Sequence, residues 1–215
     1  MADPPIDRAG ADRADGPSVE LRPATPAPDE GLAFARYLDE AAEGFFGLML
    51  GKRAPEIIAT AYAEPDHDLS YQNATFAERD GKIVGMVAGF TAEQHRRSSL
   101  EPLERAADRS LRMRTVNLLF RPLMRILDTV DDRDYYLQAI AVDPEVRGGG
   151  VSAVLMDSLV ERARASGADR LALDVSANNG RARRFYERHG FTVESRWPKR
   201  VPVPGFTLYR MTKEL

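Results

Sequence analysis

A run of three glycines in the C-terminal half of the chain sets the strongest constraint on the fold. The segment Arg147-Gly148-Gly149-Gly150 follows a strand-like stretch at 135–142 and opens a helix-like stretch at 151–167. Glycine lacks a Cβ, so a ligand can approach such a loop closely. The first turn of a helix adds free N–H groups and a partial positive charge. The order strand, glycine loop, helix therefore predicts an anion site, and a diphosphate is the anion that suits it.

Two familiar phosphate motifs do not explain the loop. The dinucleotide pattern G-x-G-x-x-G is absent, and no Gly-Lys-Ser/Thr follows the glycines as it does in nucleotide-binding P-loops. Three glycines alone also suit a plain flexible turn, so the diphosphate interpretation needs a second signal from the sequence.

The rest of the chain alternates between strand and helix patterns. Asp80-Gly81 joins two strand-like stretches and is a strong hairpin signal. Asp29 is expected to cap a helix that begins near Glu30, and the apolar stretch 45–50 is expected to be buried or to line a pocket. We expect strands at 18–23, 73–79, 82–90, 135–142, 170–177, 191–195 and 206–212, and helices at 30–42, 54–64, 151–167 and 178–190. This order predicts an α+β fold with a mixed central sheet of about six to seven strands, flanked by helices.

The length of 215 residues predicts one domain with a tail and an insertion. Residues 1–17 are rich in proline, glycine and charge and are expected to be a disordered tail, which leaves 18–215 as the domain. An Arg-rich helical insertion at 92–133, with helices near Pro102 and Pro122, separates the third and fourth strands. It is either a solvated helix pair that covers the core, a substrate lid, or a surface for a partner such as the second copy in a homodimer.

Composition excludes several classes of protein. The absence of cysteine excludes a disulfide framework, a thiolate zinc site and a cysteine nucleophile. Three scattered histidines argue against a metal centre, and 30 basic against 33 acidic residues argue against nucleic-acid binding. No apolar run is long enough for a membrane span, and the N-terminus lacks a secretory signal core. We expect a cytoplasmic protein with no membrane contact, and the excess of arginine over lysine suggests a bacterial source.

Two motifs together resemble the GNAT superfamily of acetyl-CoA-dependent N-acetyltransferases. The family's lead-in V-x-P-x-x-R-G matches residues 142–148, and its loop pattern Gln/Arg-x-x-Gly-x-Gly/Ala matches Arg147, Gly150 and Ser152, with serine in place of the usual small residue. A later family pattern, N-x-x-A-x-x-x-Y-E-x-x-G-F, matches Asn179, Ala182, Tyr186, Glu187, Gly190 and Phe191. The resemblance covers residues 18–215 as a succession of elements, and its motifs lie within 140–191.

The resemblance implies a binding mode for acetyl-CoA, the expected cosubstrate. Backbone groups of Ile140 and Val142 on the fourth strand would hold the pantetheine arm and the thioester. The side chain of Asn179 would contact the amide region of that arm. The pyrophosphate would be cradled by N–H groups of Arg147, Gly148, Gly149, Gly150, Val151 and Ser152.

The resemblance also implies that Tyr186 protonates the departing CoA thiolate. A thiol pKa is near 8.5 and a phenol pKa near 10, so a tyrosine can give this modest help; a core aromatic on an amphipathic helix is the alternative. For Asn179 the alternative is a turn or cap residue. The general base stays open, because Tyr136 stands where some family members place a glutamate. The weak candidates are Asp134, Glu78, Glu93 and Asp174.

The expected activity is direct transfer of acetyl from acetyl-CoA to a primary amine of an unidentified small molecule or peptide. The alternative is a non-catalytic module of the same fold that binds or senses acyl-CoA. An intact acid position at Tyr186 favours the enzyme. The sequence contains no motif for the acceptor, for a preferred acyl chain or for the oligomeric state.

Overall fold

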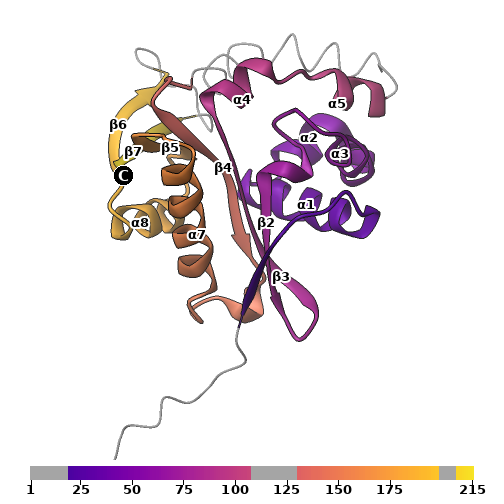
Figure 1. Ribbon diagram of the computed structural model, residues 1–215, viewed down its shortest axis with the longest axis horizontal. Coiled ribbons are helices and arrows are strands. Elements are labelled where there is room, and N and C mark those ends of the chain that lie inside the picture. Colours follow the sequence, from indigo (N-terminus) through magenta and orange to yellow (C-terminus); the bar gives the residue numbers. More distant parts are fainter. Residues whose placement is uncertain (1–18, 108–129, 199–206) are drawn as a thin grey trace, which may run out of the picture.

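A seven-stranded mixed sheet forms the centre of the protein in the computed structural model, which describes residues 19–107, 130–198 and 207–215 (Figure 1). The strand order is β1-β2-β3-β4-β5-β7-β6; β4 and β5 run parallel and every other neighbouring pair is antiparallel. The strands are β1 (Glu20–Pro23), β2 (Ala74–Arg79), β3 (Lys82–Thr91), β4 (Asp134–Val142), β5 (Arg170–Ser176), β6 (Thr192–Trp197) and β7 (Leu208–Glu214). The expected α+β fold with six to seven strands is confirmed.

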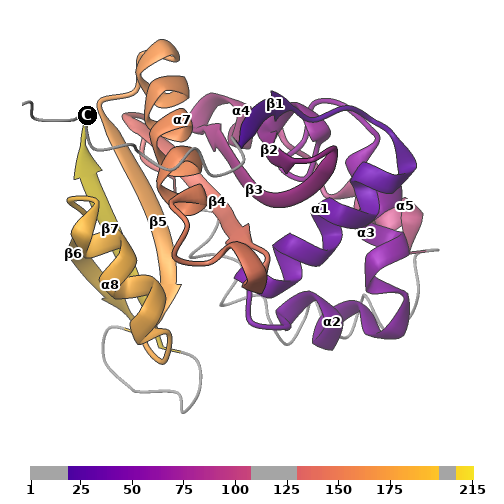
Figure 2. The ribbon, with the colours of Figure 1, turned by 90° about the horizontal axis from the view of Figure 1, so that it is seen from below.

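Helices lie on both faces of the sheet, so its central strands are buried on two sides, whereas the edge strand β6 is mostly exposed (Figure 2). On one face α1 and α3 pack on Phe76, Met86 and Ala88; on the other, α7 packs on Ala77 and Val87. This alternation along β2 and β3 follows from the two-residue period of a strand. The described helices are α1 (Pro28–Ala41), α2 (Phe45–Leu50), α3 (Ala54–Tyr62), α4 (Ala92–Arg97), α5 (Glu101–Ala106), α7 (Val151–Ala165) and α8 (Gly180–Arg188), with single 3-10 turns at Gly51–Arg53, Tyr71–Asn73 and Pro144–Val146.

The start of α1 differs from the sequence-based expectation. Its N-cap is Ala27, whose side chain makes no capping bond, and Pro28 occupies the first turn. Proline suits that position because its fixed φ is helical and its missing N–H has no intrahelical partner there. The prediction of Asp29 as the cap was therefore wrong. Asp29 and Glu30 instead lie in the first turn, where their negative charge favours the helix dipole.

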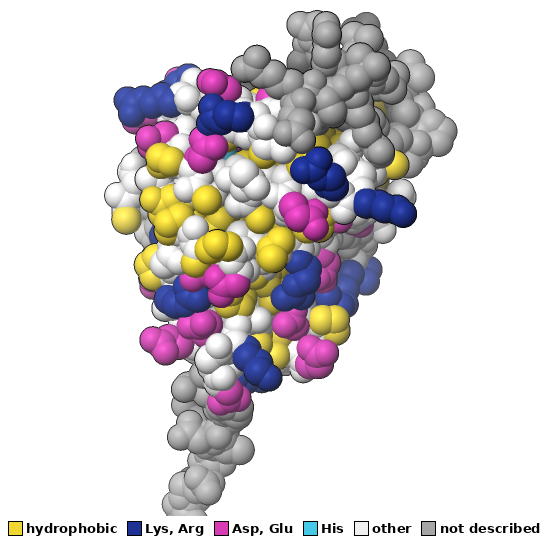
Figure 3. Space-filling model, turned by 90° about the vertical axis from the view of Figure 1, so that its right-hand side faces the viewer, with side chains coloured by type: hydrophobic (Ala, Val, Ile, Leu, Met, Phe, Trp, Pro, Cys, Tyr) yellow, Lys and Arg dark blue, Asp and Glu magenta, His cyan; other side chains and the backbone are white. Residues whose placement is uncertain are grey.

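Two short helices, α4 and α5, follow β3: α5 lies where a helix was expected near Pro102, and α4 was not expected. The helix expected near Pro122 and the tail at 1–17 lie outside the described residues. The side of the molecule that carries α1, α2 and α3 shows apolar atoms in its middle, bordered by charges (Figure 3). Across the described part of the chain, no helix is both long and apolar enough to cross a membrane.

The centre of the sheet is split. Parallel β4 and β5 pair only where Asp134, Tyr135 and Tyr136 meet Arg170, Leu171 and Ala172. An ion pair holds the closed end of this split: Arg170 Nε donates to Asp134 Oδ1 at 2.8 Å, and the Asp134 side chain is 2% exposed. Beyond Tyr136 the two strands diverge and leave one edge of each without a neighbour.

Replacing Asp134 with asparagine should lower the free energy of unfolding by about 3 kcal/mol, because the largely buried Arg170 guanidinium then keeps only Glu194 as a carboxylate partner. Urea denaturation measures this change. Asp132→Asn is the matched control. Asp132 pairs with Arg96 on the surface and its side chain is 81% exposed, so the urea midpoint of this variant should stay close to that of wild type. Equal stability of Asp134→Asn and wild type would contradict a clamping role for this ion pair.

Candidate functional site

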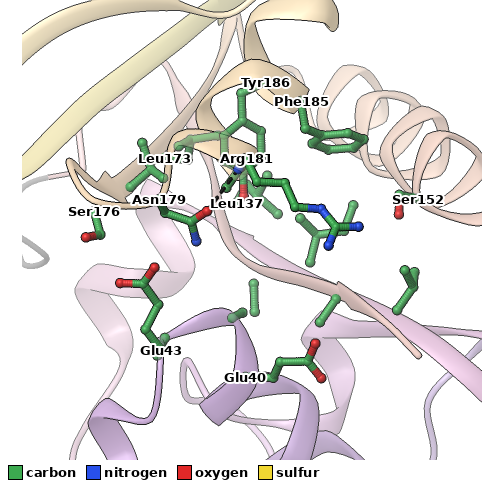
Figure 4. A pocket seen from close by; sticks show the side chains of 18 of the residues that line it. Glu40, Glu43, Leu137, Ser152, Leu173, Ser176, Asn179, Arg181, Phe185 and Tyr186 are labelled. Carbon is green, nitrogen blue, oxygen red and sulfur yellow. Dashed lines mark hydrogen bonds between the residues drawn. The ribbon is translucent and has the colours of Figure 1, made fainter. Parts of the chain in front are cut away.

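A cleft of about 860 Å³ occupies the split between β4 and β5. Its walls come from β4 and β5, the glycine loop, α8, the C-terminal end of α1, and Phe45 and Leu48 of α2. Glu40 and Glu43 reach in from α1 and the turn after it, opposite Asn179, Arg181 and Tyr186 (Figure 4). Phe45 and Leu48 line the cleft while Met49 and Leu50 are buried, which agrees with the expectation that the apolar stretch 45–50 is buried or lines a pocket.

The glycine loop forms one end of the cleft. Gly148 and Gly150 both line the cleft and have left-handed φ angles of +85° and +84°, which side chains other than glycine rarely adopt. A Cβ at either position would meet no atom within 4 Å, so the space beside them is open. α7 begins at Val151, so Val151 and Ser152 precede its first intrahelical hydrogen bonds, whereas the Ala153 N–H already donates to the Gly150 carbonyl at 2.9 Å.

The other loop residues have different environments. Gly149 and Val151 do not line the cleft: a Cβ on Gly149 would lie 3.2 Å from the Val146 carbonyl oxygen, and the Val151 side chain is 1% exposed in the core. Arg147 lines the cleft, forms an ion pair with Glu40 and donates to the Val142 carbonyl at 3.3 Å. Ser152 also faces the cleft (Figure 4). Arg147 and Ser152 therefore present side chains to the cleft, whereas the side chain of Val151 packs in the core.

Asn179 lies at the start of α8 and is its N-cap. Its Oδ1 accepts a hydrogen bond from the Ala182 N–H at 2.9 Å, which is the usual geometry of a capping asparagine. The same side chain lines the cleft (Figure 4). Capping engages the carbonyl oxygen of the side chain and leaves its NH₂ group available for a ligand.

Tyr186 lines the cleft from the middle of α8. Its ring packs edge-on against Phe185 and Phe191, with centroids 5.5 and 5.7 Å away. Burial raises the pKa of the Tyr186 phenol well above its usual value near 10. The phenol is therefore protonated throughout the neutral and mildly alkaline range.

A buried polar network lies beside Tyr186. Asp174 lines the cleft and accepts from Arg210 Nε at 2.9 Å and Nη2 at 2.8 Å, and its Oδ2 also accepts from the Tyr136 hydroxyl at 3.1 Å. Burial raises the pKa of Asp174, while Arg210 acts in the opposite direction as the smaller effect. Burial likewise raises the pKa of Tyr136.

The other carboxylates considered as general bases lie elsewhere. Asp134 is bound to Arg170 at the closed end of the split. Glu78 is bound to Arg22, which lowers the Glu78 pKa, and Glu93 pairs with Arg97 on the surface. None of these three lines the cleft, whereas Asp174 does. Sequence reasoning missed Arg210, Glu40, Glu43 and Arg181; no local pattern reveals them, because each reaches the site through tertiary packing.

The fold and the cleft define a split-sheet protein with a glycine loop at one end of the cleft and a half-buried tyrosine in the cleft wall. The profile of the Acetyltransferase (GNAT) family matches residues 37–191, most of the chain, so the chain belongs to this family. The GNAT family uses acetyl-CoA as its cosubstrate.

Among the described residues no group of three or more His, Asp or Glu could hold a metal ion.

Relatives and solved structures agree with this family. A mycothiol acetyltransferase of Brachybacterium faecium is 40% identical over 65 residues, which are 30% of this chain and 20% of that protein. An uncharacterized N-acetyltransferase of Mycobacterium bovis is 35% identical over 85 residues, 40% of this chain and 54% of the relative. The matches thus span between a fifth and about half of the length of these relatives.

Solved structures are similar over nearly the whole chain. The crystal structure of an acetyltransferase superposes with a TM-score of 0.63 at 25% identity and covers 91% of this chain and 98% of its own. An N-acetyltransferase from Staphylococcus aureus Mu50 has a TM-score of 0.66 at 19% identity, with 90% and 99% covered, and this likeness shows the fold alone.

Replacing Asn179 with alanine should lower the free energy of unfolding by about 1 kcal/mol, because the Ala182 N–H loses its capping partner. Chemical denaturation followed by circular dichroism measures the loss. Asn178→Ala is the control, since Asn178 is exposed and is bonded through its backbone: its N–H donates to Ser176 Oγ and its carbonyl accepts from the Gly180 N–H. If both variants lose the same stability, the cap is not what Asn179 contributes.

Proposed function

We propose that this protein transfers an acetyl group from acetyl-CoA to a primary amine by direct attack. The observation that carries the proposal is the split between β4 and β5, whose cleft is lined by the glycine loop at the start of α7 and by the half-buried Tyr186 of α8. It offers an anion site at one end and a proton donor at the other. An elongated cosubstrate with a diphosphate at one end and a thioester at the other matches this layout.

The backbone of β4 would hold the pantetheine arm. On the side that faces β5, β4 has no neighbouring strand after Tyr136, so its N–H and C=O groups can pair with the amides of the arm. Ile140 and Val142 lie on this free edge, and their other edge pairs with Val87 and Gly85 of β3. The NH₂ group of Asn179 would contact the same arm from the opposite wall.

The glycine loop would hold the pyrophosphate. Arg147, Gly148, Gly150 and Ser152 line the cleft and can contact it. The Gly149 N–H donates to the Val146 carbonyl at 3.1 Å and the Arg147 N–H to the Pro144 carbonyl at 3.3 Å, so Val151 rather than Gly149 would add a backbone N–H. Arg147 is already paired with Glu40, so a bound diphosphate would share or displace that carboxylate. Because Glu40 already neutralises part of the Arg147 charge, the partial positive charge at the N-terminus of α7 would then attract the diphosphate.

The reaction would begin when the neutral amine nitrogen attacks the thioester carbonyl carbon. Free N–H groups of β4 would stabilise the oxyanion. The C–S bond then breaks, its electron pair goes to sulfur, and the amine loses one proton. Because burial raises the Tyr186 pKa, the phenol would first stabilise the developing thiolate as a hydrogen-bond donor. Tyr186 would give its proton to sulfur and recover one from solvent.

Of the four carboxylates considered as general bases, Asp174 is the one that lines the cleft, and it could receive the proton of the amine, directly or through water. Burial favours this role, since it makes the carboxylate more basic, while the ion pair with Arg210 opposes it. The second candidate function is a module that senses acyl-CoA without turnover. Both functions need the same cofactor site, and only turnover separates them.

Acetyl-CoA at about 100 times its Kd should stabilise the native protein by about 2.7 kcal/mol and raise Tm by about 5–10 °C. Gly150→Glu should abolish the shift, because it adds a side chain and a negative charge where the pyrophosphate would lie. Gly167→Glu is the matched control: Gly167 ends the same helix with a φ of +79° and equally open space. Thermal unfolding with and without millimolar acetyl-CoA measures both.

No shift for wild type, or an equal shift for an adenine dinucleotide such as NAD, would contradict the assignment of the cleft to acetyl-CoA. Loss of the shift in both variants would show that backbone strain, rather than the position of the loop, is responsible.

Replacing Tyr186 with phenylalanine keeps the ring and removes only the hydroxyl. We expect kcat to fall by roughly 10²–10⁴-fold and the acetyl-CoA Kd to stay nearly constant. The assay follows thiol release with spermidine, kanamycin, free amino acids, a dipeptide and a lysine peptide. Tyr71→Phe is the control, because Tyr71 packs against Tyr62 outside the cleft. The raised pKa of Tyr186 predicts that wild type keeps this acid function up to about pH 10.

Unaltered turnover by Tyr186→Phe would return Tyr186 to a packing role. A modest rise in Kd together with a modest loss of kcat would mean that it positions the pantetheine arm. Acetyl-CoA binding without thiol release for every amine would favour the sensing module.

A further inference from the structure

An irregularity in β4 places one polar residue in the cleft. The pairing of β3 with β4 shifts where Ala88 faces Ala139 and Gly89 faces Leu137, so Gln138 has no partner on β3. Such a β-bulge inserts an extra residue into one strand and redirects its side chain. The packing agrees: Leu137 belongs to the α7 side of the sheet, whereas Ala139, two residues later, belongs to the α1 side.

The bulge lies at the point where the sheet opens. The last residue of β4 that pairs with β5 is Tyr136, two positions before Gln138. Gln138 lines the cleft, and its side-chain Oε1 is buried without a hydrogen-bond partner in the described part of the protein. The other buried side-chain atoms with this property belong to Asp68, Arg79 and Arg183, none of which lines the cleft.

A buried carbonyl oxygen without a donor is unfavourable, because it has lost water and gained nothing in return. Native proteins pair nearly all such atoms, so an exception inside a ligand cleft indicates a donor that arrives with the ligand. The missing partner must be an N–H or O–H group.

Two ligand groups could supply this donor: an amide of the pantetheine arm or the acceptor amine. The position of Gln138 along β4 favours the amine. If the proposed function holds, Ile140 and Val142 bind the pantetheine arm, and Gln138 lies further toward the closed end of the split, beside the Tyr136 that contacts Asp174. The end of the arm, which carries the thioester, would reach this region, and the amine would meet it there.

We propose that Gln138 is the acceptor-binding residue: its side-chain oxygen accepts a hydrogen bond from an N–H of the incoming amine and orients the nitrogen lone pair toward the thioester. This rests on the proposed acetyl transfer. A neutral primary amine has two N–H groups, so it can donate one to Gln138 and lose the other to the base. A hydroxyl or thiol acceptor has a single hydrogen and cannot do both, so Gln138 selects for primary amines.

The test is Gln138→Met, which keeps the length of the side chain and removes its polar atoms. We expect kcat/KM for the amine to fall about ten-fold, since one hydrogen bond in the reactive complex is lost. The acetyl-CoA Kd should not change. Tm of the ligand-free variant should equal or exceed that of wild type, because a buried oxygen without a partner is replaced by an apolar group. The probe amine is the one of the assay panel with the highest wild-type kcat/KM.

Gln72→Met is the matched control. The Gln72 Oε1 accepts a hydrogen bond from the Asp66 N–H at 3.0 Å and lies outside the cleft. This variant should lose stability and keep its kcat/KM, which is the opposite of the result expected at Gln138.

Four results would overturn the proposal. A raised acetyl-CoA Kd in Gln138→Met would assign the oxygen to the pantetheine arm. A lowered Tm of the free variant with unchanged kcat/KM would make Gln138 structural. A wild type that binds acetyl-CoA but releases no thiol with any amine would contradict the transfer function and this proposal with it, whereas normal turnover by Gln138→Met would contradict only the role of Gln138.

Discussion

The divergence of β4 from β5 is the constraint on which the rest of this structure depends. A sheet normally pairs every inner strand on both edges, because unpaired backbone groups inside a protein are unfavourable. Here the pairing of these two central strands stops after Tyr136. The Asp134–Arg170 ion pair holds the closed end, and α7 and α8 flank the open one. The free strand edge, the first turn of α7 and the start of α8 thereby face one common cleft.

Charges are distributed unevenly around that cleft. Arg147, Arg181 and Arg188 line it from the glycine loop and α8, and Glu40 and Glu43 line it from the end of α1 and the turn that follows. The Arg147–Glu40 ion pair bridges the two walls, so part of the basic charge is already neutralised before a ligand arrives. In the proposed binding mode, the N–H groups of the loop would therefore add to the basic charge that remains for a diphosphate.

The sequence predicts those parts of the site that are set by local backbone conformation. Gly148 and Gly150 have left-handed φ angles, and Asn179 caps α8; each is a short-range requirement that leaves a pattern in the chain. Side chains brought together by strand register leave none. Asp174 meets Arg210 because β5 and β7 pair in one particular register. Local rules also compete: Pro28 begins α1 where Asp29 was expected to cap it.

The bulge in β4 is the clearest feature of the site that local sequence patterns do not predict. The stretch 135–142 looks like one regular strand in the sequence, and its alternation places Gln138 on the same face as Tyr136. The extra residue breaks that alternation, so Leu137 and Ala139 fall on opposite faces. A bulge weakens pairing and here leaves a buried oxygen without a partner. Two unfavourable features at one residue, at the point where the sheet opens, have a common explanation if that residue is shaped for a ligand rather than for the fold.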